Sequence, residues 1–256
     1  MNVLVCVKRV PATGGQISLT ADGQEIDTRY LGFTVSPHEE CAVEEAVRIV
    51  EAGGGSSTVL TLGPEVASEQ LRDAMAIGVD RAVLLETDGS DWDPVATAGA
   101  IVDAVRALEA EGAPFDLIMF GNESADAGNF QVGIRVATAL GRPVVSGVKG
   151  IEAGDGRLVA RREAAGGWEV FELPLPAVLG VKEGLNLPRY PSVPGRLRAR
   201  KKEIVRMTPS RRPGGPTKER LRLPQAEESQ VEVIGNGADA APAVVELLTR
   251  LGVVGR

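Results

Sequence analysis

The stretch from Phe115 to Gly141, "FDLIMFGNESADAGNFQVGIRVATALG", decides the fold. Its apolar run at 115–121 predicts a buried strand, and 129–141 predicts a helix that ends at Gly141. A polar, glycine-containing loop joins them. A strand followed directly by a helix is the repeating unit of a parallel sheet covered by helices.

Three similar units precede this one. Strands are predicted at 2–8, 57–62 and 81–86, and helices follow at 37–53, 64–78 and 93–112. The first helix has Ser36 as its N-cap, Pro37 at its first position and Glu39 completing a capping box. Its predicted buried face is Val43, Ala46, Val47 and Val50. Four strand-helix units in series predict an α/β fold with a doubly wound, mostly parallel, Rossmann-like sheet.

The pattern changes after Pro143. Short β-like pieces with turns at Asp155-Gly156 and Gly166-Gly167 predict an antiparallel extension of the sheet. The stretch 207–216, "MTPSRRPGGP", is rich in Pro and Gly and predicts no core element. A strand-like 231–235 and a helix within 238–252 follow. We therefore expect an α/β domain at 1–205 and, at 206–256, an extended C-terminal arm and helix that pack on a partner.

Composition excludes several classes of protein. Apolar residues make up 43% of the chain, and no stretch approaches the length needed to cross a bilayer. The start reads as a strand and not as a signal peptide, and two cysteines favour a reducing, cytoplasmic location. One histidine and two cysteines offer little for a metal site, and neither a catalytic triad motif nor a P-loop is present.

The charge is unevenly distributed. The net charge is −7, yet 189–222 holds twelve Lys and Arg residues against only Glu203 and Glu219. Such a basic band on an acidic chain indicates a partner surface. Nucleic acid is disfavoured because Tyr190 is the band's single aromatic residue and the rest of the chain is acidic.

Ligands of an open parallel sheet bind at the carboxyl ends of its strands. Here these ends are Val7–Pro11, Leu62–Pro64 and Gly121–Gly133. The last offers glycines and polar side chains before a helix N-terminus, which suits a phosphate, although an ordinary polar loop fits the same pattern. Glu123 and Asp126 would repel a triphosphate, so a nucleotide monophosphate is favoured.

Three further residues near these ends stay open between two interpretations. His38 follows the helix cap near the ligand edge, or is a solvated first-turn residue. Lys8 and Arg9 reach a phosphate or partner, or mark where the strand leaves the core. Cys41, like Cys6 in the first strand, is expected in core packing.

Several stretches together resemble the electron transfer flavoprotein β subunits. They are "VLVCVKRVP", "SPHEECAVEEAVRIVEAG", "AMAIGVDRAVLL", "DLIMFGNESADAGNFQVGIRVATALGRPVV" and "LPAVLGVKEGLNLPRYPSVPGRLRARKKEI". The resemblance covers most of the chain and implies a fold of the adenine-nucleotide α-hydrolase-like type. It implies an electron carrier without acid-base catalytic residues, paired with an α subunit that holds most of an FAD, while this chain binds a structural AMP.

The resemblance also implies residue roles. His38 would contact the flavin. The AMP site would comprise Cys6, Ser36, Pro37, Glu39, Leu62, Gly63, Asn122, Ser124, Asp126, Gly128, Asn129, Gln131, Val132 and Gly133. Two departures are Ser36, where the family usually has Asn, and Asp126-Ala127-Gly128, where a run of acids is common.

Partner roles follow from the same resemblance. The recognition loop, 184–202, would dock acyl-CoA or other flavin dehydrogenases, as in fatty acid oxidation, through Val193 and a basic rim of Arg196, Arg198, Arg200, Lys201 and Lys202. Electrons would pass on to a membrane-bound quinone oxidoreductase. Two alternatives remain open: a bifurcating relative with a second FAD in place of AMP, and an adenine-nucleotide enzyme or stress-type binding module.

Overall fold

The computed structural model describes residues 1–12, 14, 17–112, 114–154, 156–224 and 233–254. They form two compact units, Met1–Arg220 and Leu221–Arg256. The sequence suggested an earlier boundary, after residue 205. No helix in the described ranges is both long and apolar enough to span a membrane.

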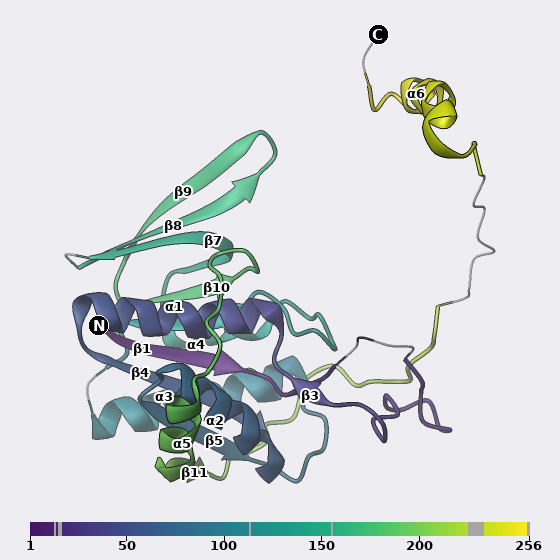
Figure 1. Cartoon of the computed structure of the whole chain (residues 1–256). Helices are drawn as coiled ribbons and strands as arrows, with labels where there is room; N and C mark the ends of the chain where they lie inside the picture. Colours follow the sequence, from purple (N-terminus) through teal and green to yellow (C-terminus); the bar gives the residue numbers. More distant parts are fainter. Residues whose placement is uncertain (13, 15–16, 113, 155, 225–232, 255–256) are drawn as a thin grey trace. The chain divides into compact units, whose positions relative to one another are not determined.

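A nine-stranded sheet organises the first unit (Figure 1). Its order is β11-β5-β4-β1-β6-β10-β7-β8-β9. The strands are β1 (Asn2–Val7), β4 (Ser56–Gly63), β5 (Arg81–Glu86), β6 (Leu117–Gly121), β7 (Val144–Gly154), β8 (Arg157–Ala164), β9 (Gly167–Pro174), β10 (Ala177–Val181) and β11 (Ile204–Met207). The pairs from β11 to β7 are parallel, and β7-β8 and β8-β9 are antiparallel. The prediction of a mostly parallel sheet with an antiparallel extension is confirmed.

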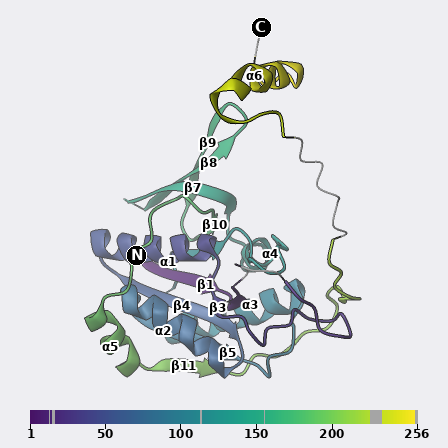
Figure 2. The ribbon, with the colours of Figure 1, turned by 45° about the vertical axis from the view of Figure 1, so that its right-hand side comes forward.

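Helices cover both faces of the sheet. They are α1 (Pro37–Gly53), α2 (Ser68–Ile77), α3 (Pro94–Glu111), α4 (Val132–Leu140) and α5 (Val193–Lys201). β1 separates two apolar clusters: Val3, Val5 and Val7 pack with residues of α1 and α2, whereas Leu4 and Cys6 pack with α3 and α4. This alternation follows from the two-residue period of a strand. The β8-β9 pair projects beyond the helical layers (Figure 2).

Helix starts match the predicted caps in two cases. Ser36 and Glu39 form the capping box of α1, and the Asp93 side chain accepts two backbone hydrogen bonds at the start of α3. Helix α4 begins at Val132 and not at residue 129, because Phe130 has a positive φ of 56° that no helix permits. A short 3₁₀ helix, η1 (Glu65–Ala67), replaces the predicted first turn of α2.

Smaller elements complete the chain. β2 (Val10–Pro11) pairs with β3 (Phe33–Thr34), and an isolated antiparallel bridge joins Leu19 to Ile26. The second unit contains η2 (Gly237–Ala240) and α6 (Ala241–Arg250). Asp155 of the predicted turn and residues 231 and 232 of the predicted strand lie outside the described residues.

Candidate functional site

Three strand ends lie side by side at the carboxyl edge of the sheet, because β1 is hydrogen-bonded between β4 and β6. The segments leaving these strands begin at Lys8, Pro64 and Asn122. The N-terminus of α1 packs against the same edge: a Cβ on Gly121 would lie 2.7 Å from Cγ of Glu39. The fold therefore assembles the strand ends that the sequence singled out.

A buried carboxylate ties this edge together. Oε1 of Glu39 accepts a 2.8 Å hydrogen bond from the Lys8 amide, and Oε2 accepts one of 2.8 Å from the Ser36 amide. The Ser36 hydroxyl accepts from the Glu39 amide and donates to the Glu123 carbonyl at 3.4 Å. Burial raises the pKa of Glu39 to about 7, against the lowering effect of its hydrogen bonds. Ser36 and Glu39 thus shape the site, and their side chains are engaged in hydrogen bonds within the chain.

The loop after β6 is closed on itself and tied to β1. Nζ of Lys8 lies 2.6 Å from Oδ2 of Asp126. Burial would raise the pKa of Asp126, but the charge and hydrogen bond of Lys8 outweigh it, and the pKa is lowered. The Gly128 amide donates to the Ser124 carbonyl at 3.1 Å, and Gly128 has a φ of +54°. The loop's acidic character is therefore partly neutralised by Lys8.

Asn122 forms hydrogen bonds within the fold through its side chain and its backbone. Its Oδ1 accepts a 2.8 Å hydrogen bond from the Gly147 amide, and its own amide donates to the Val181 carbonyl at 2.7 Å. These contacts join the end of β6 to β7 and β10.

The N-terminus of α4 is more open than the capped N-terminus of α1. No side chain caps it in the described part of the chain. Oε1 of Gln131 instead accepts hydrogen bonds of 3.1 and 2.9 Å from the guanidinium of Arg135. The helix approaches β6 closely, since a Cβ on Gly133 would lie 3.1 Å from the Phe120 ring. An uncapped helix start with positive partial charge suits an anion.

Phe130 was not predicted from the sequence. It is the non-glycine residue with positive φ in the described chain, and its side chain is 51% exposed. A strained backbone that presents an aromatic group to solvent is typical of functional loops. The available sequence signal was a large aromatic residue two positions before the first residue of α4.

His38 is held from two sides. Its Nδ1 accepts a 2.7 Å hydrogen bond from the Glu183 amide and so carries no proton. Nε2 therefore carries the proton and lies 3.4 Å from Oε1 of Glu123. The imidazole is only 15% exposed, so the interpretation of a solvated first-turn residue is wrong.

The remaining predicted AMP residues differ in what they offer. Cys6 is buried in the core, where its position in β1 pairs with β4 and β6, and burial raises the pKa of its thiol. The Gly63 carbonyl accepts from the Thr87 amide at 2.9 Å. Pro37 begins α1, Leu62 and Val132 are partly buried, and Asn129 is exposed.

Lys8 and Arg9 both point to contacts within the chain. Lys8 pairs with Asp126, while the guanidinium of Arg9 stacks 3.3 Å from the centroid of the Phe33 ring. Nε of Arg9 is buried and has no hydrogen-bond partner in the described part of the chain. Within the same ranges, no group of three or more His, Cys, Asp or Glu residues is placed to hold a metal ion.

The predicted recognition loop is only partly a loop. It crosses α1 and then continues as helix α5, which begins at Val193 (Figure 1). The prediction of a loop through 202 is wrong, because Ser192 caps this helix by accepting from the Gly195 amide and Pro194 suits its first turn.

Four apolar side chains of this segment are exposed, of which only Val193 was predicted. Their exposed fractions are 85% for Leu187, 96% for Tyr190, 73% for Val193 and 55% for Leu197. We call these four residues the docking surface. Their position among prolines in a basic segment was a sequence signal that went unused.

The residues of the predicted basic rim differ in their exposure. Arg196, Arg198, Arg200 and Lys201 are exposed, whereas Lys202 is partly buried and its Nζ donates to the Val79 carbonyl at 2.8 Å. Lys202 therefore serves to hold α5 to the end of α2.

Comparison with known proteins agrees with this architecture. A family model described as the electron transfer flavoprotein domain matches residues 25–211. The electron transfer flavoprotein subunit beta of Syntrophomonas wolfei is 36% identical over 206 residues, 80% of this chain and 79% of the relative. The chain belongs to the electron transfer flavoprotein β-subunit family.

Other β subunits match over similar or greater lengths. The electron transfer flavoprotein subunit beta of Mycobacterium tuberculosis is 36% identical over 213 residues, 81% of this chain and 79% of the relative. That of Bacillus subtilis is 32% identical over 258 residues and 97% of each chain. The family resemblance inferred from the sequence is confirmed.

Proposed function

We propose that this chain is the β subunit of a heterodimeric electron carrier, whose α subunit holds most of an FAD. The observation that carries the proposal is its identity of 32 to 36% with β subunits of that name over most of the chain. The flavin supplies the redox chemistry when bound, and the protein supplies binding and orientation. No acid-base step is assigned to any residue of this chain.

A structural AMP is proposed at the carboxyl edge of the sheet. Support comes from the N-terminus of α4, which no side chain caps in the described part of the chain. The phosphate would lie at the start of α4, where Gln131 holds the guanidinium of Arg135. Asp126 and Glu123 favour one phosphate over several, as Coulomb repulsion grows with phosphate charge.

Extraction of the purified heterodimer tests this assignment. We expect one FAD and one AMP per heterodimer, measured by absorbance and by chromatography of the released nucleotides. Two FAD molecules and no AMP would replace the assignment with the bifurcating type. A chain that is stable alone, free of flavin and able to hydrolyse ATP would replace the carrier function altogether.

His38 is the proposed flavin contact in this subunit. Its fixed, neutral imidazole at the α1 N-terminus supports a role as a rigid wall with a defined orientation. His38→Leu keeps a side chain of moderate size but removes both polar contacts, so we expect a shifted flavin absorption spectrum. An unchanged spectrum and potential would remove the contact from the proposal.

The docking surface is proposed to bind flavin dehydrogenases of the acyl-CoA type. Four exposed apolar side chains beside exposed arginines match the anchor-and-rim pattern of transient interfaces. We expect Val193→Ala to slow reduction by such a dehydrogenase about tenfold, equivalent to about 1.4 kcal/mol, with an unchanged flavin spectrum. An altered spectrum with normal transfer would contradict this role.

The second unit is proposed to pack on the α subunit. Helix α6 is amphipathic, and Val244, Val245 and Leu251 are 37%, 58% and 64% exposed. An apolar helix face without a core of its own favours a partner surface.

We further propose that electrons leave the heterodimer to a membrane-bound quinone oxidoreductase, as in fatty acid oxidation in the cytoplasm.

A further inference from the structure

The segment 183–189 follows one stripe of helix α1. The Glu183 amide is bound by His38 in the first turn of the helix. Further along, Nδ2 of Asn186 donates to the Cys41 carbonyl at 3.0 Å and to Oε2 of Glu45 at 2.9 Å. Residues 38, 41 and 45 lie three or four positions apart, so they share one face of the helix.

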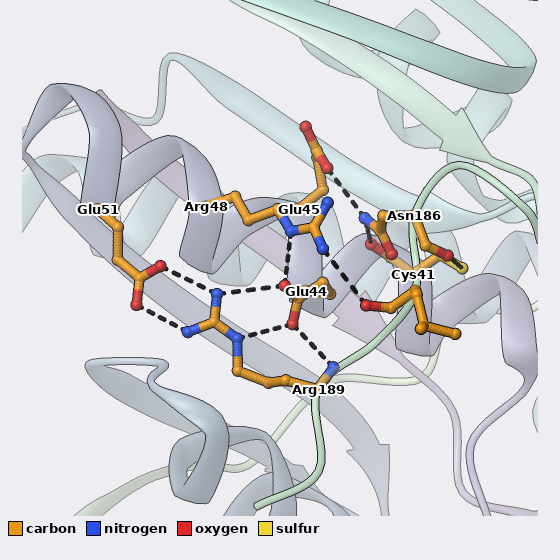
Figure 3. Close-up of polar contacts among 8 residues, drawn as sticks. Cys41, Glu44, Glu45, Arg48, Glu51, Asn186 and Arg189 are labelled. Atoms are coloured by element: carbon orange, nitrogen blue, oxygen red, sulfur yellow. Dashed lines mark hydrogen bonds and ion pairs between the residues drawn. The ribbon is translucent and has the colours of Figure 1, made fainter.

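Arg189 is the last and strongest of these attachments (Figure 3). Its amide and its Nε donate to Oε2 of Glu44 at 3.1 and 2.9 Å. Its two terminal nitrogens donate to the two carboxylate oxygens of Glu51 at 2.8 and 2.9 Å. This fork-to-fork geometry fixes the orientation of the guanidinium as well as its position.

Glu44 depends on this pairing. Its side chain is only 1% exposed, and Nε of Arg48 supplies a further hydrogen bond of 2.6 Å. Burial would raise the pKa of Glu44, but the hydrogen bonds of Arg189 and Arg48 outweigh it, and the pKa is lowered. A buried carboxylate that loses its partner is strongly unfavourable, so Glu44 holds Arg189 in place.

The other end of the segment is fixed to α2. A Cβ on Gly195 would lie 2.2 Å from the Ala76 carbonyl oxygen, which places α5 directly on α2. NH1 of Arg72 donates to the Ala199 carbonyl at 2.7 Å. Only residues 190–192 separate Arg189 from the start of α5. The docking surface is therefore attached to α1 through Arg189 and to α2 through α5.

We propose that Arg189 is a positioning residue for the docking surface, acting through Glu44 and Glu51 of helix α1. This inference rests on the proposed docking function. Helix α1 then sets the place of Leu187, Tyr190 and Val193, while its N-terminus borders the candidate nucleotide site. A docking surface held rigid before encounter loses little entropy on binding.

The test uses the full heterodimer with its flavin and an acyl-CoA dehydrogenase supplied with its acyl-CoA substrate. We expect Arg189→Gln to raise the apparent KM for the heterodimer about tenfold, with kcat and the flavin spectrum unchanged. Arg189→Lys keeps the charge but not the fork, so its effect should be intermediate. Arg161→Gln, which breaks an exposed ion pair with Glu152 on the antiparallel extension, is the matched control.

Hydrogen exchange separates this inference from the docking proposal. We expect faster amide exchange over 183–199 in Arg189→Gln and unchanged exchange in α3 and α4. Glu51→Gln is the second variant, for the case that Arg189→Gln does not fold, because the Glu51 carboxylate is 57% exposed. It should show the same changes in KM and exchange to a smaller degree. Wild-type KM and exchange in these variants would overturn the inference. If exchange is faster in the variants but the dehydrogenase does not reduce the flavin of even the wild-type heterodimer, the docking proposal is overturned and the positioning role of Arg189 stands.

Discussion

Glu39 joins the end of β1 to the start of α1 through one carboxylate. Its two oxygens accept the amides of Lys8 and Ser36, and its own amide is capped by Ser36. Because the folded pKa of about 7 exceeds the ordinary value of 4.5, the folded state binds a proton that the unfolded state releases between these values. Stability from this group is therefore complete below pH 4.5 and is lost as pH rises through 7.

Glu39→Gln tests this accounting. Glutamine presents one acceptor and one donor where two amides need acceptors, so below pH 4.5 we expect a loss of about 1–3 kcal/mol in the free energy of unfolding. The wild type should lose up to about 3 kcal/mol between these pH limits, and the variant should lack that slope. Urea denaturation at several pH values measures both. A gap between the two proteins that widens as pH rises would contradict the assignment.

Residue roles were only partly predictable from the sequence. Ser36 and Glu39 were recognised as a capping box because the pattern is local and its chemistry is fixed by spacing. The double attachment of His38 was not, because its partners Glu123 and Glu183 are distant in sequence and meet only in the folded sheet. Lys202 was misjudged for the same reason: its partner is the backbone of Val79.

At the scale of elements, helix α5 depends on a glycine. The N-terminal turn of α5 lies against the last turn of α2, and the obstacle to any side chain at Gly195 is a backbone carbonyl. Neither group can move aside without shifting a helix. The absence of a side chain at Gly195 is therefore what allows α5 to pack directly on α2.

Gly195→Ala should displace α5 from α2. We expect a loss of about 1–3 kcal/mol from overpacking, measured by chemical denaturation. Gly53→Ala is the control, because a Cβ at Gly53 meets no atom within 4 Å. Equal stability of the two variants would show that α5 packs less tightly than described.

Elements with local signals were predictable, and their neighbours in the sheet were not. Capping residues and apolar periodicity located the strand-helix units up to Gly141. The insertion of β10 between β6 and β7, and the pairing of β11 with β5, depend on contacts between distant segments. Ile204–Met207 follows a basic run directly and gave too short an apolar signal to be predicted as a strand.

At the scale of the molecule, part of the basic band is neutralised within the chain. Arg206 pairs with Glu65 and Glu86, Arg212 with Asp103, and Lys218 with Asp91. We call residues 206–220 the strap. Met207 pairs with β5 and packs against the core, whereas Arg211, Arg212 and Lys218 further along the strap are held through their charged groups. The charge available to a partner is therefore smaller than composition indicated.

The strap should loosen in salt. Raising NaCl from 0.1 to 1 M shortens the Debye length from about 10 to about 3 Å, which weakens exposed ion pairs. We expect faster hydrogen exchange over 206–220 at high salt, and unchanged exchange in β1 and β6. Asp103→Asn should reproduce part of this effect at low salt. An exchange rate independent of both changes would indicate apolar attachment instead.

The place of β11 at the edge of the sheet has a consequence for biosynthesis. β5 pairs with β4 on one side and with β11 on the other, yet among the strands of the described residues β11 is the last to be synthesised. During translation, the outer edge of β5 has no partner until residue 207 has left the ribosome. A nascent chain with such an open edge is prone to pair with neighbouring chains. Completion of the sheet, and with it protection from aggregation, comes only when most of the polypeptide has been made.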